Sequence, residues 1–237
     1  MSTEPGPGPA GSGPGRRHEP DLRAMTRITL RPIASPMPLG FFTVAIASVM
    51  TGCLQLGVLG PADRQAVALC VLPAFALQLL VSVLAFGARD VIAATLMGSF
   101  AGSWLAYALV MGSGAPGGPR VLGVFNLAFL CLGALMAAVT RPKRALWLVL
   151  VVSLPRWAAT GLGGLTGSEG AVRTAGALGI LVALAAGYAA FALMLEDVRS
   201  GEVLPVGRSG PAQHAVEGGL AVQLRDIERQ AGVRRTL

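Results

Sequence analysis

Residues 35–57, which read SPMPLGFFTVAIASVMTGCLQLG, contain no charged side chain and combine two prolines with a long apolar run. About 20 consecutive apolar or small residues are enough to cross the hydrocarbon core of a bilayer as a helix. Proline is tolerated in the first turn of a helix because its missing N–H has no intrahelical partner there. The segment therefore predicts a first transmembrane helix, with Pro36–Gly40 as a rigid collar at its mouth.

Five further apolar segments follow this first one along the chain. The expected spans are residues 40–59, 66–86, 91–110, 121–139, 145–164 and 174–195. Charged residues make up 13% of the chain and hydrophobic residues 53%, whereas soluble domains contain about 25% charged residues. The mean hydropathy of +0.64 also indicates a surface in contact with lipid. We therefore expect an all-α, polytopic membrane protein whose six transmembrane helices form one bundle over residues 35–207.

Two polar segments flank the predicted bundle. Residues 1–34 are rich in Pro, Gly and Arg and predict a disordered basic arm, and residues 208–237 predict a polar tail. Six spans place both ends of the chain on one side, together with the basic turns at 89 and 141–144, while the other side carries Arg64, Arg120 and Arg173. Because basic residues collect in cytoplasmic loops, we expect both termini in the cytoplasm and the bundle in the cell membrane. This topology explains the net charge of +7 without a nucleic-acid partner.

Catalytic and metal-binding patterns are missing from the predicted spans. No Asp, Glu, His or Lys lies in the middle of any span, and Cys53, Cys70 and Cys131 lie in apolar segments without metal-ligand spacing. Buried cysteine usually packs as a small hydrophobic residue. An intramembrane enzyme would need ionisable groups or a nucleophile next to a base. We therefore expect neither an enzyme nor a bound metal or cofactor, and the sequence favours transport.

Arg156 is a charged residue within the fifth predicted span, directly after Pro155. An arginine inside the membrane is costly and by default marks a functional path. Two interpretations are open: Arg156 lines an aqueous vestibule and attracts a small carboxylate, or it extends to the outer interface of the membrane. Gln78, Ser99 and Tyr188 are polar side chains within spans that can contact a solute, although each can also bond a neighbouring helix backbone.

The first span also carries the motif of a known family. The residues Ser35, Pro36, Met37, Pro38, Leu39 and Gly40 resemble the Asn-Pro-Ala-Pro-Leu-Gly motif of the acetate uptake transporter family, the AceTr or YaaH group of acetate/succinate–proton symporters. The similarity extends to Gly207. Gln78 falls on a family glutamine, Ser99 on the Ser-Tyr-Gly-Ser-Phe-Trp segment, Tyr188 on a tyrosine of the last span, and residues 203–207 (VLPVG) on Val-Leu-Pro-Ile-Gly.

This resemblance implies a six-helix protomer with its own pore, assembled as a homohexamer. The family's pore constriction consists of a phenylalanine, a tyrosine and a leucine, and these positions correspond here to Val44, Phe100 and Leu154. The corresponding constriction would be entirely apolar. Gln78, Ser99, Arg156 and Tyr188 are the candidates for the substrate path.

The resulting hypothesis is a transporter or channel for small monocarboxylates such as acetate, with succinate as a further substrate. An apolar constriction passes a neutral molecule more readily than an ion. Protons are therefore expected partners, either by coupling or because the undissociated acid crosses. Two alternatives stay open: a channel for another small neutral solute, and a non-transporting scaffold or sensor with the same fold.

Overall fold

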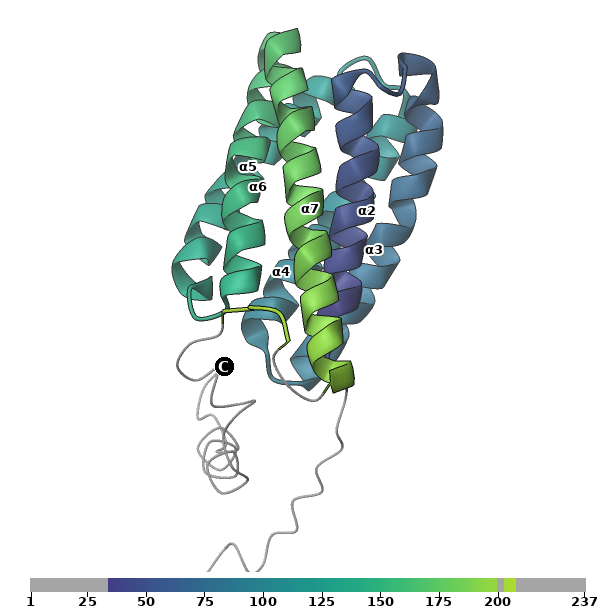
Figure 1. Cartoon of the computed structure of the whole chain (residues 1–237). Coiled ribbons are helices and arrows are strands. Elements are labelled where there is room, and N and C mark those ends of the chain that lie inside the picture. Colours follow the sequence, from purple (N-terminus) through teal and green to yellow (C-terminus); the bar gives the residue numbers. More distant parts are fainter. Residues whose placement is uncertain (1–33, 200–202, 208–237) are drawn as a thin grey trace, which may run out of the picture. The chain divides into compact units, whose positions relative to one another are not determined.

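The computed structural model describes residues 34–199 and 203–207, and helices dominate this part of the chain (Figure 1). The long helices are α2 (Met37–Leu56), α3 (Arg64–Gly87), α4 (Val91–Ser113), α5 (Gly118–Thr140), α6 (Arg144–Thr166) and α7 (Glu169–Arg199), and the 3₁₀ turn η1 (Pro61–Asp63) precedes α3. All six are long and apolar enough to cross a membrane. The described residues contain no strand, so the prediction of an all-α bundle of six membrane-crossing helices is confirmed. Most of the predicted arm, and the predicted tail at 208–237, lie outside the described residues.

The helix ends coincide with prolines and glycines of the sequence. Helix α2 begins directly after Pro36, and Pro38 lies in its first turn, where no backbone donor is lost. Helices α2 and α6 end at Gly57 and Gly167, whose φ angles of 80° and 71° lie in the left-handed region that glycine adopts without steric cost. Helix α7 continues past the predicted end of its span to Arg199.

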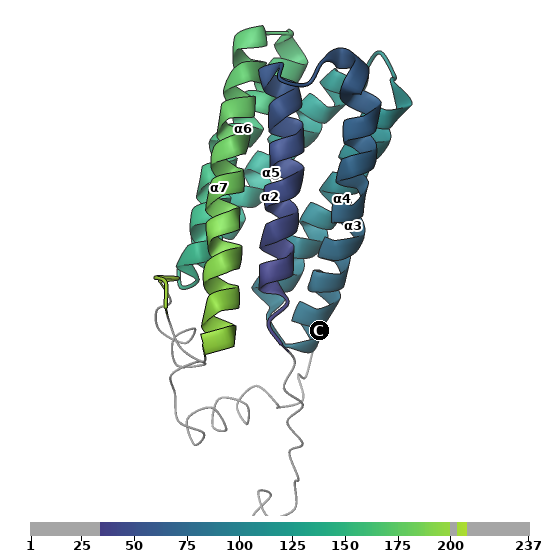
Figure 2. The same ribbon diagram turned by 45° about the vertical axis from the view of Figure 1, so that its right-hand side comes forward.

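The six helices form a closed ring, because each packs against the next in the chain and α7 returns to α2. The most extensive contacts join α3 to α4, α2 to α7, α5 to α6 and α6 to α7, whereas α4 and α5 touch over a much smaller area. Figure 2 shows α3 beside α4 on one side of the bundle and α6 beside α7 on the other. The first residues of α2 and the last of α7 lie at the same end of the bundle (Figure 1).

Glycines allow two of these helix pairs to approach closely. A Cβ on Gly52 of α2 would lie 3.1 Å from the carbonyl oxygen of Gly176 on α7. A Cβ on Gly164 of α6 would lie 2.9 Å from the Cα of Gly123 on α5. Such backbone-to-backbone contact through small residues is the usual way in which membrane helices gain packing energy. These contacts hold α7 against α2 and α6 against α5, and α6 carries Arg156, a charged residue of the bundle interior.

Asp90 joins two turns at the end of the bundle where α2 begins. Its carboxylate accepts a hydrogen bond from the N–H of Ala93 at 3.1 Å and so caps α4, and it also pairs with the ammonium group of Lys143 between α5 and α6. We expect Asp90→Ala to destabilise the bundle by about 1–2 kcal/mol, because an N-cap and a partly exposed ion pair are lost together. Thermal unfolding of the detergent-solubilised protein measures this loss.

The matched variant Asp90→Asn separates the two contributions. Asparagine caps a helix as well as aspartate does, so this variant loses only the ion pair, which is worth at most about 1 kcal/mol at a partly exposed site. A stability of Asp90→Asn equal to that of Asp90→Ala would contradict the assigned capping role.

Candidate functional site

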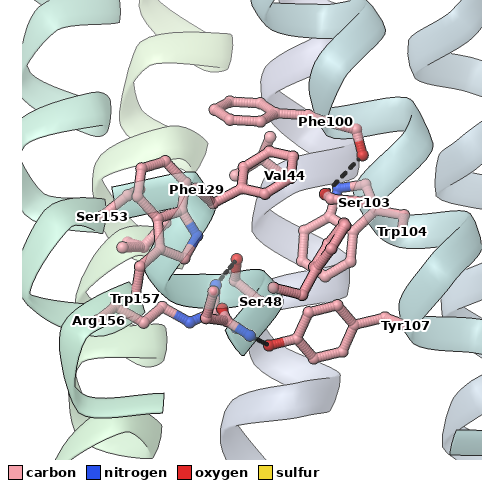
Figure 3. Close-up of a pocket in the computed structure, with 13 residues that line it drawn as sticks. Val44, Ser48, Phe100, Ser103, Trp104, Tyr107, Phe129, Ser153, Arg156 and Trp157 are labelled. Carbon is pink, nitrogen blue, oxygen red and sulfur yellow. Dashed lines mark hydrogen bonds between the residues drawn. The ribbon is translucent and has the colours of Figure 1, made fainter. Parts of the chain in front are cut away.

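A cavity lies inside the ring, between α2, α4, α5, α6 and α7 (Figure 3). Its volume of about 30 Å³ has room for roughly two water-sized groups. The residues that line this central cavity are Val44, Ser48, Phe100, Ser103, Trp104, Tyr107, Phe125, Asn126, Phe129, Ser153, Arg156, Trp157 and Val182. Aromatic rings and one buried cation therefore form most of its wall.

Three aromatic side chains from three helices narrow the central cavity. The ring of Phe100 on α4 lies 6.4 Å from that of Phe129 on α5 and 5.9 Å from that of Trp157 on α6, and the last two are 5.9 Å apart. Distances of this kind are typical of favourable aromatic pairs. Val44 of α2 lines the same part of the cavity (Figure 3). We call Phe100, Phe129 and Trp157 the aromatic neck, which offers a passing solute no polar atom except the indole N–H.

Arg156 is buried beside the aromatic neck and is held by hydroxyl groups of α2. Its Nη1 donates a hydrogen bond to Ser48 Oγ at 2.8 Å, and its Nη2 donates to Thr51 Oγ1 at 2.6 Å. The side chain of Arg156 reaches α2 by passing next to Gly179 of α7. A Cβ on Gly179 would lie 3.2 Å from Nε of Arg156. The glycine thus leaves the space that the guanidinium occupies. The side chain of Arg156 lies inside the helix ring and does not extend to the outer interface of the membrane.

No carboxylate in the described part of the chain balances the charge of Arg156. The described acidic residues, Asp63, Asp90, Glu169, Glu196 and Asp197, all lie at or near helix ends. Glu196 is buried too, but it lies seventeen residues along α7 from Gly179, which corresponds to about 25 Å of helix. A buried charge without a counterion is costly. Hydroxyl groups alone compensate this cost in the described structure.

A second cavity continues from the first towards the loops after α4 and α6. Its volume is about 190 Å³, and its wall includes Gln55, Arg64, Leu122 and Thr160. We call it the vestibule. Tyr107 lines both the vestibule and the central cavity.

Tyr107 is held in this position by a side chain of α5. Its hydroxyl accepts a hydrogen bond from Asn126 Nδ2 at 2.5 Å, and the same amide nitrogen donates to the carbonyl oxygen of Leu122 at 2.6 Å. Phe100 precedes Tyr107 by seven residues on α4, or about 10 Å. Tyr107 lines both cavities, whereas Arg156 and the aromatic neck line only the central cavity, so a solute from the vestibule passes Tyr107 before it reaches Arg156 and the neck.

The structure places the sequence-predicted site residues in different surroundings. Val44, Phe100 and Arg156 line the central cavity. Leu154 does not: its Cδ2 lies at the α5–α6 interface, 2.9 Å from where a Cβ on Gly133 would be. Trp157, three residues further along α6, lies in the cavity wall instead. The three positions implied by the resemblance therefore do not meet in one ring of side chains.

Gln78, Ser99 and Tyr188 line neither of the two cavities. Gln78 is completely buried, and its amide nitrogen lies 3.5 Å from the carbonyl oxygen of Gly40. Ser99 donates to the carbonyl oxygen of Thr95 on its own helix at 2.8 Å. Tyr188 is 42% exposed, and its hydroxyl donates to the carbonyl oxygen of Pro205 at 3.2 Å. In this structure these three side chains bond backbone groups.

The motif at residues 35–40 lies at the start of α2 and not in the cavity wall. Ser35, Pro36, Pro38 and Leu39 form its entry and first turn. A Cβ on Gly40 would lie only 2.8 Å from the sulfur of Met97 on α4. The motif therefore sets how α2 enters the bundle and packs against α4.

Sequence reasoning missed most of the aromatic wall. Trp104 and Tyr107 follow Phe100 at intervals of four and three residues, and Phe129 follows Phe125 after four. Residues with this spacing lie on one face of a helix. Since aromatic residues make up only 5% of the chain, two aromatic faces on consecutive spans were a usable signal.

These features define a multi-pass α-helical membrane protein with a cavity inside its ring of helices. The chain belongs to the GPR1/FUN34/yaaH family, whose sequence profile matches residues 17–207. The family resemblance found in the sequence is thereby confirmed. No curated protein is significantly similar in sequence.

One solved structure with the same fold is described as that of the bacterial acetate channel SatP. It has a TM-score of 0.69 and 20% sequence identity, and the similarity covers 74% of this chain and 100% of that chain. At this level of identity, the likeness establishes the fold of the bundle.

Proposed function

We propose that this protein conducts acetate or another small monocarboxylate across the cell membrane, through the cavities inside its own helix ring. The observation that carries the proposal is the sequence of environments along one line: a vestibule, a buried arginine, and then an aromatic neck. Membership of the family and the acetate channel of the same fold support this choice of solute.

The aromatic neck determines the form in which the solute crosses. Moving a carboxylate between apolar rings requires the loss of its hydration, which is far more costly for an ion than for the neutral acid. We therefore propose that the undissociated acid passes Phe100, Phe129 and Trp157, and that the proton crosses with it. If the termini are cytoplasmic, the vestibule opens to the outside, because it lies at the opposite end of the bundle.

Uptake of labelled acetate into proteoliposomes tests the proposal. With an acidic exterior we expect protein-dependent initial rates to rise about tenfold for each unit by which the external pH is lowered, because above its pKa of about 4 a carboxylic acid gains about tenfold in neutral fraction for each unit by which the pH falls. Protein-free liposomes measure the acid that crosses lipid directly. Protein-dependent uptake that ignores the gradient would contradict passage of the neutral acid, and no protein-dependent uptake would contradict the transport function itself.

A variant with a filled cavity supplies the matched control for this assay. Ser153 lines the central cavity, and its hydroxyl only bonds the carbonyl oxygen of Val149 on the same helix, at 2.7 Å. In Ser153→Phe, an aromatic ring would occupy a space of about 30 Å³. We expect this variant to lose protein-dependent uptake while its helical circular dichroism stays unchanged.

A further inference from the structure

The polar groups around Arg156 are mostly hydrogen-bond donors without acceptors. A guanidinium group has five N–H donors, and two of those of Arg156 bond Ser48 and Thr51. The other three have no acceptor among the described residues. The indole N–H of Trp104, which is 7% exposed and lines the same cavity, also has no partner there.

Tyr107 adds one more donor to this set. Its oxygen accepts the hydrogen bond from Asn126, so its own proton is left without an acceptor in the described structure. Figure 3 shows the Tyr107 hydroxyl turned towards the side of the cavity where Arg156 lies. Arg156, Trp104 and Tyr107 come from two helices, α6 and α4, and all three line the central cavity.

The acceptors at this place are hydroxyl oxygens and the amide oxygen of Asn126, and none of them is charged. The hydroxyl oxygens of Ser48 and Thr51 accept from Arg156. Ser103 and Ser153 line the cavity, but their hydroxyls donate to carbonyl oxygens of their own helices, each at 2.7 Å. A positive charge, a surplus of donors and no carboxylate among the described residues are the conditions under which a buried site binds an anion.

We propose that Arg156, Trp104 and Tyr107 form a binding site for one small monovalent oxyanion in the middle of the conduit. A planar group with two oxygens matches the parallel N–H donors of a guanidinium. The choice of a carboxylate as this anion rests on the proposed function. The volume of about 30 Å³ admits the two oxygens of a small carboxylate such as formate or acetate.

The vestibule fits this role because it carries a second cation. Arg64 lies in its wall, at the start of α3. A single sign of charge in a cleft with low-dielectric walls raises the local concentration of the opposite ion. An anion that enters the vestibule therefore meets Arg64 first and Arg156 behind Tyr107. It is held there until a proton from the external water, which reaches the site through the vestibule, converts it to the neutral acid that crosses the aromatic neck.

Tryptophan fluorescence provides a direct assay of this site. Trp104 and Trp157 line the central cavity, and Trp147, the third tryptophan of the chain, does not. The full-length protein in lipid nanodiscs is titrated with sodium acetate. Each addition of acetate replaces an equal amount of sodium gluconate, so that the ionic strength stays constant. We expect a saturable change in fluorescence, with formate competing and the bulky gluconate without effect.

The pH dependence of this titration identifies the bound form. If the anion binds, the total acetate needed for half-saturation is the same at pH 7 and pH 6, since nearly all acetate is ionised at both values. If the neutral acid binds, half-saturation needs about tenfold less total acetate at pH 6, because a carboxyl group has a pKa of about 4. The second result would overturn the proposal.

Variants assign the binding to the three residues. We expect Arg156→Gln to weaken acetate binding at least tenfold and Arg156→Lys to weaken it less, because the ammonium keeps the charge but not the paired donors. Trp104→Phe keeps an aromatic ring and removes only the N–H, so a loss of a few-fold is expected. Arg173 is an exposed arginine in an ion pair with Glu169. Arg173→Gln is therefore the matched control, and we expect it to leave acetate binding unchanged.

The binding and uptake assays can fail separately. Acetate uptake without saturable binding, or with binding that Arg156→Gln leaves intact, would overturn the anion site and leave the proposed function standing. Binding that needs Arg156, without any protein-dependent uptake, would support the anion site and contradict transport.

Discussion

Replacing Gly164 by alanine is expected to prevent the normal packing of α5 against α6. A Cβ at this position would lie 2.3 Å from the carbonyl oxygen of Pro119, 2.9 Å from the Cα of Gly123 and 3.1 Å from its backbone nitrogen. All three are backbone atoms, which cannot rotate away as the end of a side chain can. Overpacking of this kind costs about 3 kcal/mol or more, so Gly164→Ala should give a strongly lowered unfolding temperature and little monodisperse protein on size exclusion.

Gly187→Ala is the matched control for this experiment. Gly187 also lies within a transmembrane helix, but a Cβ there would meet no atom within 4 Å. Alanine is a better helix former than glycine by up to about 1 kcal/mol, so this variant should be as stable as the natural sequence or slightly more so. Equal stability of Gly164→Ala and Gly187→Ala would show that α5 and α6 do not pack through their backbones at this point.

Removing the ring of Phe100 is expected to change which acids pass. Phe100 contacts both Phe129 and Trp157, so Phe100→Ala would leave a gap on the α4 side of the aromatic neck. Each methylene that a pocket accepts or rejects is worth roughly tenfold or more in selectivity. We therefore expect the ratio of butyrate to acetate uptake by proteoliposomes to rise at least about tenfold, while acetate uptake stays within a few-fold of the natural protein.

Phe191→Ala is the same substitution away from the cavity. Phe191 is 50% exposed on α7, on a surface that faces lipid in a membrane-crossing bundle. Its removal should leave the ratio of butyrate to acetate uptake unchanged. If Phe100→Ala also leaves that ratio unchanged, then size selection takes place elsewhere along the conduit.

Arg156 and the aromatic neck have complementary roles in the proposed transport. The neck favours a neutral solute because apolar rings cannot replace water around an ion. The arginine favours an anion because its remaining N–H donors need acceptors. A carboxylic acid is a solute that satisfies both, since it takes either form with the gain or loss of one proton.

The sequence by itself predicted the fold of the bundle. The six spans and the prolines at the start of α2 act through local physics: the length of an apolar run or a missing N–H. Such properties do not depend on what a helix packs against. The ends of α2 to α6 therefore lie within three residues of the predicted span ends, whereas α7 extends beyond its predicted span at both ends.

The wall of the cavity could not be predicted in this way. In a membrane protein the lipid-facing and the inward-facing sides of a helix are both apolar, so periodicity does not distinguish them. Successive residues of a helix point about 100° apart. Ser153, Arg156 and Trp157 therefore line the cavity while Leu154, between them in sequence, packs at the α5–α6 interface.

The partners of Arg156 were decided by the tertiary structure alone. Ser48 and Thr51 are 108 and 105 residues away from it in the chain, and nothing in their local sequence marks them as its acceptors. They meet because α7 packs against both α2 and α6, with Gly179 leaving room for the guanidinium. The sequence determined that a charge would lie within the membrane, and helix packing determined that this charge would face the inside of the ring.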